Sequence, residues 1–135
     1  MDSRTTVEQT GNAKRWLLLG GVLGMLGVGA GAFGAHGLEG KLSPESLQDY
    51  EVGVRYQMYH ALALLLVSIL AERTPRKLIS AAGWLFAVGV LFFSGSIYGL
   101  VLGGWRWLIP FTPIGGSLLM IGWGCMAVAG FRKQA

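Results

Sequence analysis

Four long apolar stretches, separated by short polar connections, dominate the hydrophobic pattern of the chain. A helix needs about 20 mostly apolar residues, each rising 1.5 Å, to cross the roughly 30 Å hydrocarbon core of a bilayer. The stretches near this length predict transmembrane helices at about residues 16–35, 52–71, 78–102 and 107–131. The pattern therefore predicts an all-α integral membrane protein built as a four-helix bundle.

Composition agrees with a membrane location and argues against a nucleic-acid partner. Apolar residues make up 53% of the chain and charged residues 13%, which is about half the share usual in soluble domains. The net charge is +4, but the basic residues stand in short clusters between apolar stretches and not in one binding patch. We therefore expect the chain to contact the lipid bilayer and no nucleic acid. The single cysteine, Cys125, excludes an intrachain disulfide.

The distribution of basic residues predicts the orientation. Four spans place both termini on one side, and eight of the 11 Lys and Arg residues fall on that side: Arg4, Lys14, Arg15, Arg73, Arg76, Lys77, Arg132 and Lys133. Because cytoplasmic loops are enriched in Lys and Arg, we expect a multi-pass protein of the cell (inner) membrane with both termini in the cytoplasm. Residues 1–15 would then form a polar cytoplasmic tail, and residues 16–135 the membrane domain.

A cleaved signal peptide is the alternative for the first apolar stretch. Lys14 and Arg15 would supply the basic start of such a peptide, and Ala30-Gly31-Ala32 has the small residues of a cleavage site. The stretch is, however, as long as a full span. Its removal would leave three spans with the termini on opposite sides, so we interpret it as a retained span.

One face of the first span consists of glycine. The glycines recur at spacings of four, three, four and three residues, which places them on one side of a helix: Gly20, Gly24, Gly27, Gly31 and Gly34. In lipid, such a face allows two helix backbones to approach closely. We expect helix packing at this face, either within the chain or between two copies of it.

The second span differs from the others because polar residues extend into it. Ser43-Pro44 has the residue types of a helix start, with Ser as N-cap and Pro at the first helical position. We expect one amphipathic helix that begins outside the membrane at Pro44 and continues into the span. Its apolar face is expected to point at lipid and comprises Leu47, Val54, Met58, Leu62 and Leu65.

Polar residues gather near the outer ends of the first two spans. They are His36, Glu39, Glu51, Arg55, Tyr56, Tyr59 and His60. Because a charged side chain is unfavourable in lipid, we expect those of the second span to face the first span and to hydrogen-bond around its outer end. The cluster is interpreted either as a structural clasp for the first loop or as a small polar cavity that accepts a ligand or a proton. The short histidine spacing of a metal site is missing, so we expect no metal and no cofactor.

Two short motifs are distinctive as a pair: Gly31-Ala32-Phe33-Gly34-Ala35-His36-Gly37-Leu38 and Tyr56-Gln57-Met58-Tyr59-His60-Ala61-Leu62. With them the chain resembles the domain-of-unknown-function 423 family of small four-span bacterial inner-membrane proteins, which also contains the animal transmembrane protein 256. The resemblance covers about residues 16–132 and implies a multi-pass fold without supplying an activity. The recurrent family positions correspond to Gly34, His36, Gly37, Tyr56, Tyr59 and His60. The polar tail before Trp16 is longer than the family leads us to expect.

Motifs of catalysis are missing from the sequence. It contains no phosphate-binding loop, no nucleophile elbow and no Cys-x-x-Cys pair, and three of the four spans carry no carboxylate, Lys or Arg in their cores. We therefore expect a protein that is not an enzyme but a structural or accessory subunit of a membrane complex. Its partners would be other membrane-protein subunits or a second copy. The alternatives are a small transporter, a channel, a lipid-binding or small-ligand-binding protein, or a membrane enzyme with a histidine-based site.

Overall fold

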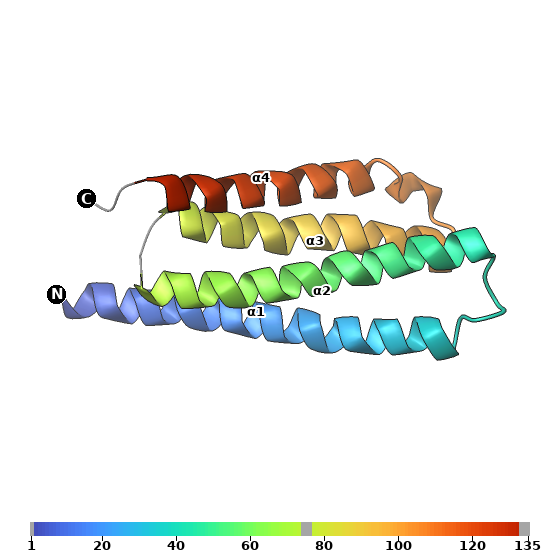
Figure 1. Ribbon diagram of the computed structural model, residues 1–135, viewed down its shortest axis with the longest axis horizontal. Helices are drawn as coiled ribbons and strands as arrows, with labels where there is room; N and C mark the ends of the chain where they lie inside the picture. Colours follow the sequence, from blue (N-terminus) through green and yellow to red (C-terminus); the bar gives the residue numbers. More distant parts are fainter. Residues whose placement is uncertain (1, 74–76, 133–135) are drawn as a thin grey trace.

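The computed structural model describes residues 2–73 and 77–132 as a bundle of four long α-helices (Figure 1). The elements are α1 (Ser3–His36), α2 (Pro44–Arg73), α3 (Lys77–Gly103), the 3-10 helix η1 (Arg106–Leu108) and α4 (Phe111–Phe131). Four helical segments are long and apolar enough to cross a membrane, which confirms the all-α four-span prediction. Arg76 and Lys133, two of the basic residues used for the orientation, lie outside the described residues.

The first helix is longer than its apolar stretch. It begins at Ser3, where the side chain of Asp2 accepts a hydrogen bond from the backbone of Arg4 as an N-cap. The part before Trp16, expected as a polar tail, is therefore a continuation of the same helix. Ser68 donates from Oγ to the carbonyl oxygen of Ala13 over 2.6 Å, which ties this extension to α2. The 34 residues of α1 span about 51 Å, more than the bilayer core requires.

The second helix begins where the sequence predicted. Its first residue is Pro44, and the Oγ of Ser43 accepts a hydrogen bond from the backbone N–H of Ser46 over 3.2 Å. Ser43 is thus the N-cap that its residue type indicated. The helix then continues for 30 residues without interruption to Arg73.

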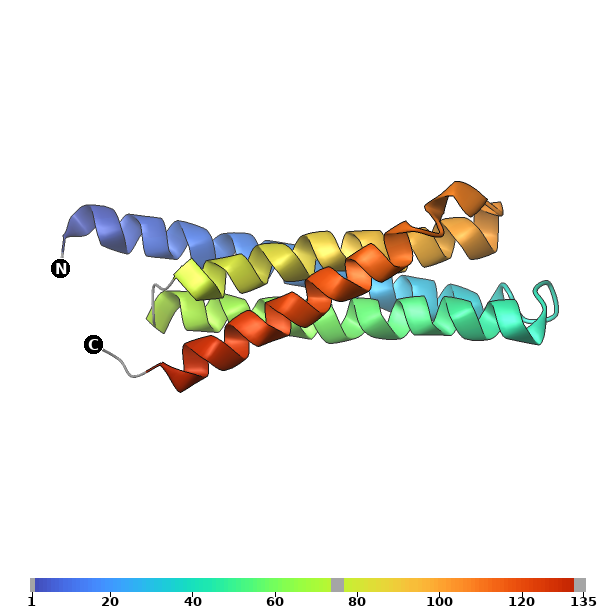
Figure 2. The ribbon, with the colours of Figure 1, turned by 90° about the horizontal axis from the view of Figure 1, so that it is seen from above.

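The helices pack in the order of the chain. α1 lies along α2, α2 along α3, and α3 along α4, whereas α1 and α3 touch only briefly. α1 and α4 therefore form the two edges of the bundle, as Figure 1 shows, and Figure 2 shows α4 running obliquely across α3. The largest fully buried side chains come from α1, α2 and α3: Trp16, Leu64, Val67, Phe86 and Val90.

The glycine face of α1 lies against α2. A Cβ atom at Gly20 would stand 2.9 Å from the carbonyl oxygen of Ala61, and one at Gly34 would stand 2.6 Å from the ring of Tyr50. A Cβ at Gly27 would meet the sulfur of Met58. Such distances leave no room for a side chain, so the backbone of α1 touches α2 directly along this face. Of the two arrangements considered for the glycines, the structure contains the one within the chain.

Replacing Gly20 with Leu should lower the free energy of unfolding by about 1–3 kcal/mol, because the side chain would enter a seam closed by backbone atoms of α2. Unfolding by sodium dodecyl sulfate in mixed micelles, followed by tryptophan fluorescence, measures the change. The matched control is Gly21→Leu, since a Cβ at Gly21 meets nothing within 4 Å. Equal losses in both variants would contradict the seam.

Candidate functional site

The structure brings only part of the predicted polar cluster together: the ring of Tyr56 contacts those of Tyr59 and His60 along α2. His60 is buried, with 3% of its surface exposed, whereas the remaining members are exposed: His36, Glu39, Glu51, Arg55, Tyr56 and Tyr59. None of the side-chain hydrogen bonds recorded within residues 2–73 and 77–132 joins His36 or Glu39 to α2. In that part of the chain, no group of three or more His, Cys, Asp or Glu side chains is placed to hold a metal ion.

The expectation that His60 faces the first span is wrong. The indole Nε1 of Trp123 on α4 donates a hydrogen bond to the Nε2 of His60 over 3.1 Å. The ring of Phe86 on α3 has its centroid 5.5 Å from that of the imidazole. The side chain of His60 on α2 therefore points toward α3 and α4 and not toward α1. Figure 1 shows that α4 and α1 occupy opposite edges of the bundle.

The face of α2 that meets α1 is the one expected to point at lipid. A Cβ at Gly31 would lie 3.5 Å from Val54, and Cβ atoms at Gly27 and Gly20 would meet Met58 and Leu65. The physical reason is shape. A glycine face is a flat trough that bulky apolar side chains fill, and contact with such a trough stabilises two helices more than contact with fluid lipid. Packing, and not polarity, thus decides which face of α2 lies against α1.

The imidazole of His60 has both nitrogens engaged. Nδ1 lies 2.7 Å from the carbonyl oxygen of Tyr56, and Nε2 accepts from Trp123. The neutral ring with its hydrogen on Nδ1 satisfies both contacts, since Nε2 must then be the acceptor. The ring of Tyr56 stacks on the imidazole at an interplanar angle of 19°. This geometry leaves no nitrogen of His60 free to line an open cavity, and it joins α2 to α4.

A second buried polar residue, Gln57, was not singled out from the sequence. It is 5% exposed. Its Nε2 donates to the carbonyl oxygen of Leu23 on α1 over 2.9 Å, and its Oε1 accepts from the hydroxyl of Tyr98 on α3 over 2.6 Å. One side chain thereby links three helices in the interior of the bundle, and both ends of its amide are hydrogen-bonded.

Other hydrogen bonds from side chain to carbonyl oxygen repeat this arrangement. The hydroxyl of Tyr50 donates to the carbonyl oxygen of Ala30 over 2.5 Å, and Ser94 donates to that of Gly53 over 2.7 Å. Gln57 lies seven residues after Tyr50, so the two occupy one face of α2. Two polar residues seven apart on one helix, next to a helix with a glycine face, are the sequence signal that would have identified Tyr50 and Gln57.

Four packed helices of spanning length, joined by buried hydrogen bonds to backbone carbonyls, define a multi-pass membrane protein in contact with the lipid bilayer. The chain belongs to the DUF423 family, described as "Protein of unknown function (DUF423)", which matches residues 30–116. This confirms the resemblance carried by the two sequence motifs.

Similar proteins occur in several bacteria. The chain is 46% identical over 119 residues to a UPF0382 membrane protein of Staphylococcus aureus (strain bovine RF122 / ET3-1), covering 88% of this chain and 97% of the relative. It is 42% identical over 120 residues to the UPF0382 membrane protein YwdK of Bacillus subtilis (strain 168), covering 88% and 98%. No solved structure matches the chain.

Replacing Gln57 with Leu should lower the free energy of unfolding by about 1–3 kcal/mol, because the hydroxyl of Tyr98 loses its buried acceptor. The exposed Gln48 on the same helix offers a matched control, and Gln48→Leu should change stability by less than about 0.5 kcal/mol. Denaturation in mixed micelles compares the two variants. A Gln57→Leu protein as stable as the control would show that the three-helix link contributes nothing.

Proposed function

We propose that this protein is a non-enzymatic structural or accessory subunit of a membrane complex, with both termini in the cytoplasm. Its two edge helices would be the faces that meet other membrane-protein subunits. The apolar windows of α1 and α4 are each 17% buried, against 44% for α2 and 33% for α3. The exposure of these two helices does not distinguish contact with lipid from contact with another protein, because lipid tails are as apolar as the side chains of a helix.

Glycines on the outer sides of the edge helices carry the proposal. A Cβ at Gly21 of α1, or at Gly124 of α4, would meet nothing within 4 Å. Glycine lowers helix stability by about 1 kcal/mol relative to alanine, and at these two positions no contact with the described residues offsets that loss. Close approach of a helix from another subunit uses such positions. A second copy of this chain is the alternative partner.

The engagement of the buried polar residues supports a role without catalysis. Gln57, His60 and Ser94 are all hydrogen-bonded within the bundle, and a transporter, channel or enzyme site would need such groups free to meet a substrate. The transporter, channel and ligand-binding alternatives would place a binding site in the polar outer half of α2, where Glu51 and Arg55 are exposed. These two residues support instead a start of α2 that extends beyond the membrane as an amphipathic helix, since charged side chains avoid lipid.

The orientation predicts the accessibility of single cysteines introduced into a Cys125→Ser background. A cysteine at Ser46, near the start of α2, should react with an impermeant thiol reagent on intact cells, because that end would lie outside. A cysteine at Thr5 should react only after the cells are opened. The reverse pattern would contradict the proposed orientation.

The accessory role predicts the size of the particle extracted from native membranes with a mild detergent. The wild-type chain should migrate on a native gel, and appear in native mass spectra, together with at least one other membrane protein. Gly21→Leu or Gly124→Leu should release it as a free chain, because a large side chain prevents close helix approach. Val22→Leu, an exposed neighbour that is already branched, is the matched control and should leave the complex intact.

Extraction of the wild type as a free chain would contradict the accessory role. An assembly that contains only copies of this chain would contradict the accessory role and would show that the chain associates with itself. Unchanged complexes in both glycine variants would show that these outer glycines are not the contact.

A further inference from the structure

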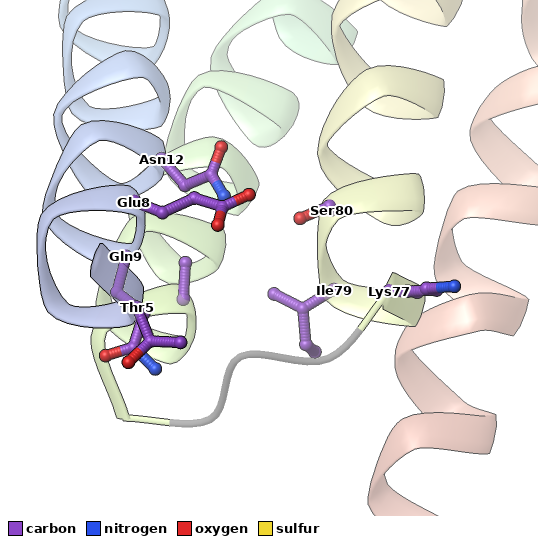
Figure 3. Close-up of a pocket in the computed structure, with 8 residues that line it drawn as sticks. Thr5, Glu8, Gln9, Asn12, Lys77, Ile79 and Ser80 are labelled. Atoms are coloured by element: carbon purple, nitrogen blue, oxygen red, sulfur yellow. The ribbon is translucent and has the colours of Figure 1, made fainter. Parts of the chain in front are cut away.

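A cavity of about 520 Å³ lies between the start of α1, the end of α2 and the start of α3 (Figure 3). Its polar lining includes Thr5, Glu8, Gln9 and Asn12 from α1 and Ser80 from α3. The apolar stretch of α1 begins at Trp16 and that of α3 begins one residue after Lys77, so the cavity lies where the bundle leaves the hydrocarbon core. Figure 1 shows that the starts of α1 and α3 lie at the end of the bundle that holds both termini, so the cavity lies at that end.

The charged side chain that faces into the cavity from the described residues is Glu8. Within residues 2–73 and 77–132, Glu8 and Lys77 are the charged residues that line it, and Figure 3 shows Glu8 and Asn12 facing Ser80 across the opening while Lys77 points away from Glu8. The carboxylate, the amide oxygen and the hydroxyl are all hydrogen-bond acceptors. A primary ammonium group has three N–H donors and a positive charge, which matches this set. A phosphate or carboxylate at the same place would be repelled by Glu8.

A cation lies farther along the same face of α1, toward the hydrocarbon. Arg15 follows Glu8 by seven residues, which is two helical turns or about 10 Å. Its guanidinium is exposed and lies 5.4 Å from the ring centroid of Trp84, which holds it at the α1–α3 boundary. Beyond it, Leu18 and Val22 on this face are exposed and apolar. From water to hydrocarbon, the face therefore presents a carboxylate, a guanidinium and then apolar side chains.

One buried donor lies at the inner end of the same seam. Trp16 is fully buried, and its Nε1 has no hydrogen-bond partner within the part of the chain that the structure describes. Trp16 follows Asn12 by one turn, and its ring lies 2.7 Å from where a Cβ of Gly83 would be, one turn after Ser80. An unsatisfied N–H is rare in a folded protein, and here it lies one turn deeper than two residues of the cavity.

We propose that this cavity binds the head group of a phospholipid that carries a primary ammonium. The carboxylate of Glu8 holds the ammonium with Asn12 and Ser80, and the guanidinium of Arg15 pairs with the phosphate. The acyl chains then lie along the exposed apolar side of α1. The order of groups on α1 is the order of ammonium, phosphate and hydrocarbon in such a lipid.

Native mass spectrometry of the purified full chain, titrated with phosphatidylethanolamine and phosphatidylcholine of identical acyl chains, tests the proposal. The wild type should retain phosphatidylethanolamine over phosphatidylcholine by about fivefold or more, because a quaternary ammonium cannot donate hydrogen bonds to Glu8. Glu8→Gln should remove that preference. Glu72→Gln, an exposed carboxylate at the same end of the bundle but outside the cavity, should keep it.

The two charged residues have separable effects. Arg15→Gln should weaken both lipids alike, since both carry the phosphate, and should leave their ratio unchanged. Saturating phosphoethanolamine, which has the same head but no chains, should not displace the bound lipid. Equal retention of the two lipids by the wild type, an unaltered preference in Glu8→Gln, or displacement by phosphoethanolamine would each overturn the proposal. Thermal stability equal to wild type in both variants shows that the readout reports binding.

Discussion

The close approach of α1 and α2 along a face without side chains is the contact on which the rest of the bundle depends. In lipid no hydrophobic force drives helices together, because the tails are as apolar as the side chains they would leave. Association must come from dispersion contacts and from hydrogen bonds between helices. The glycine face of α1 brings its carbonyl oxygens within reach of side chains on α2, as the 2.9 Å contact between Gln57 and Leu23 shows. Larger residues at these positions would separate the backbones and remove both kinds of contact.

The second helix is consequently the centre of the molecule. One side chain of α2, that of Gln57, reaches both α1 and α3, and His60 one turn later reaches α4. α1 and α4 are held mainly by their neighbours in the chain and remain at the edges of the bundle. A bundle of this kind leaves two long apolar faces and the cavity at the starts of α1 and α3, and the proposals for subunit contact and lipid binding arise from these features.

The sequence patterns predicted where the helices lie along the chain, but they did not predict which helix each face contacts. The lengths of the apolar stretches gave four spans, and Ser43-Pro44 gave the start of α2, because both depend on local geometry. The residues that surround His60 could not be predicted from local geometry. The rule that polar residues point inward does not say which neighbouring helix they meet, and α2 packs along α1 and α3 and also reaches α4 through His60. The shape of the glycine face decided the matter, and it placed Met58 against α1 while His60 turned toward Trp123.

A disulfide between α1 and α2 measures the central contact most directly. A Cβ at Gly24 would lie 3.8 Å from the Cβ of Ala61, a separation that a disulfide spans without strain. In a Cys125→Ser background, the pair Gly24→Cys and Ala61→Cys should therefore oxidise within one chain. Mass spectrometry would show the loss of two alkylation sites with no dimer. In the control pair, Gly21→Cys and Ala61→Cys, both thiols should stay reduced and react with the alkylating reagent. Cross-linked dimers, or cysteines that stay free in the first pair, would contradict a seam formed within the chain by the glycine face.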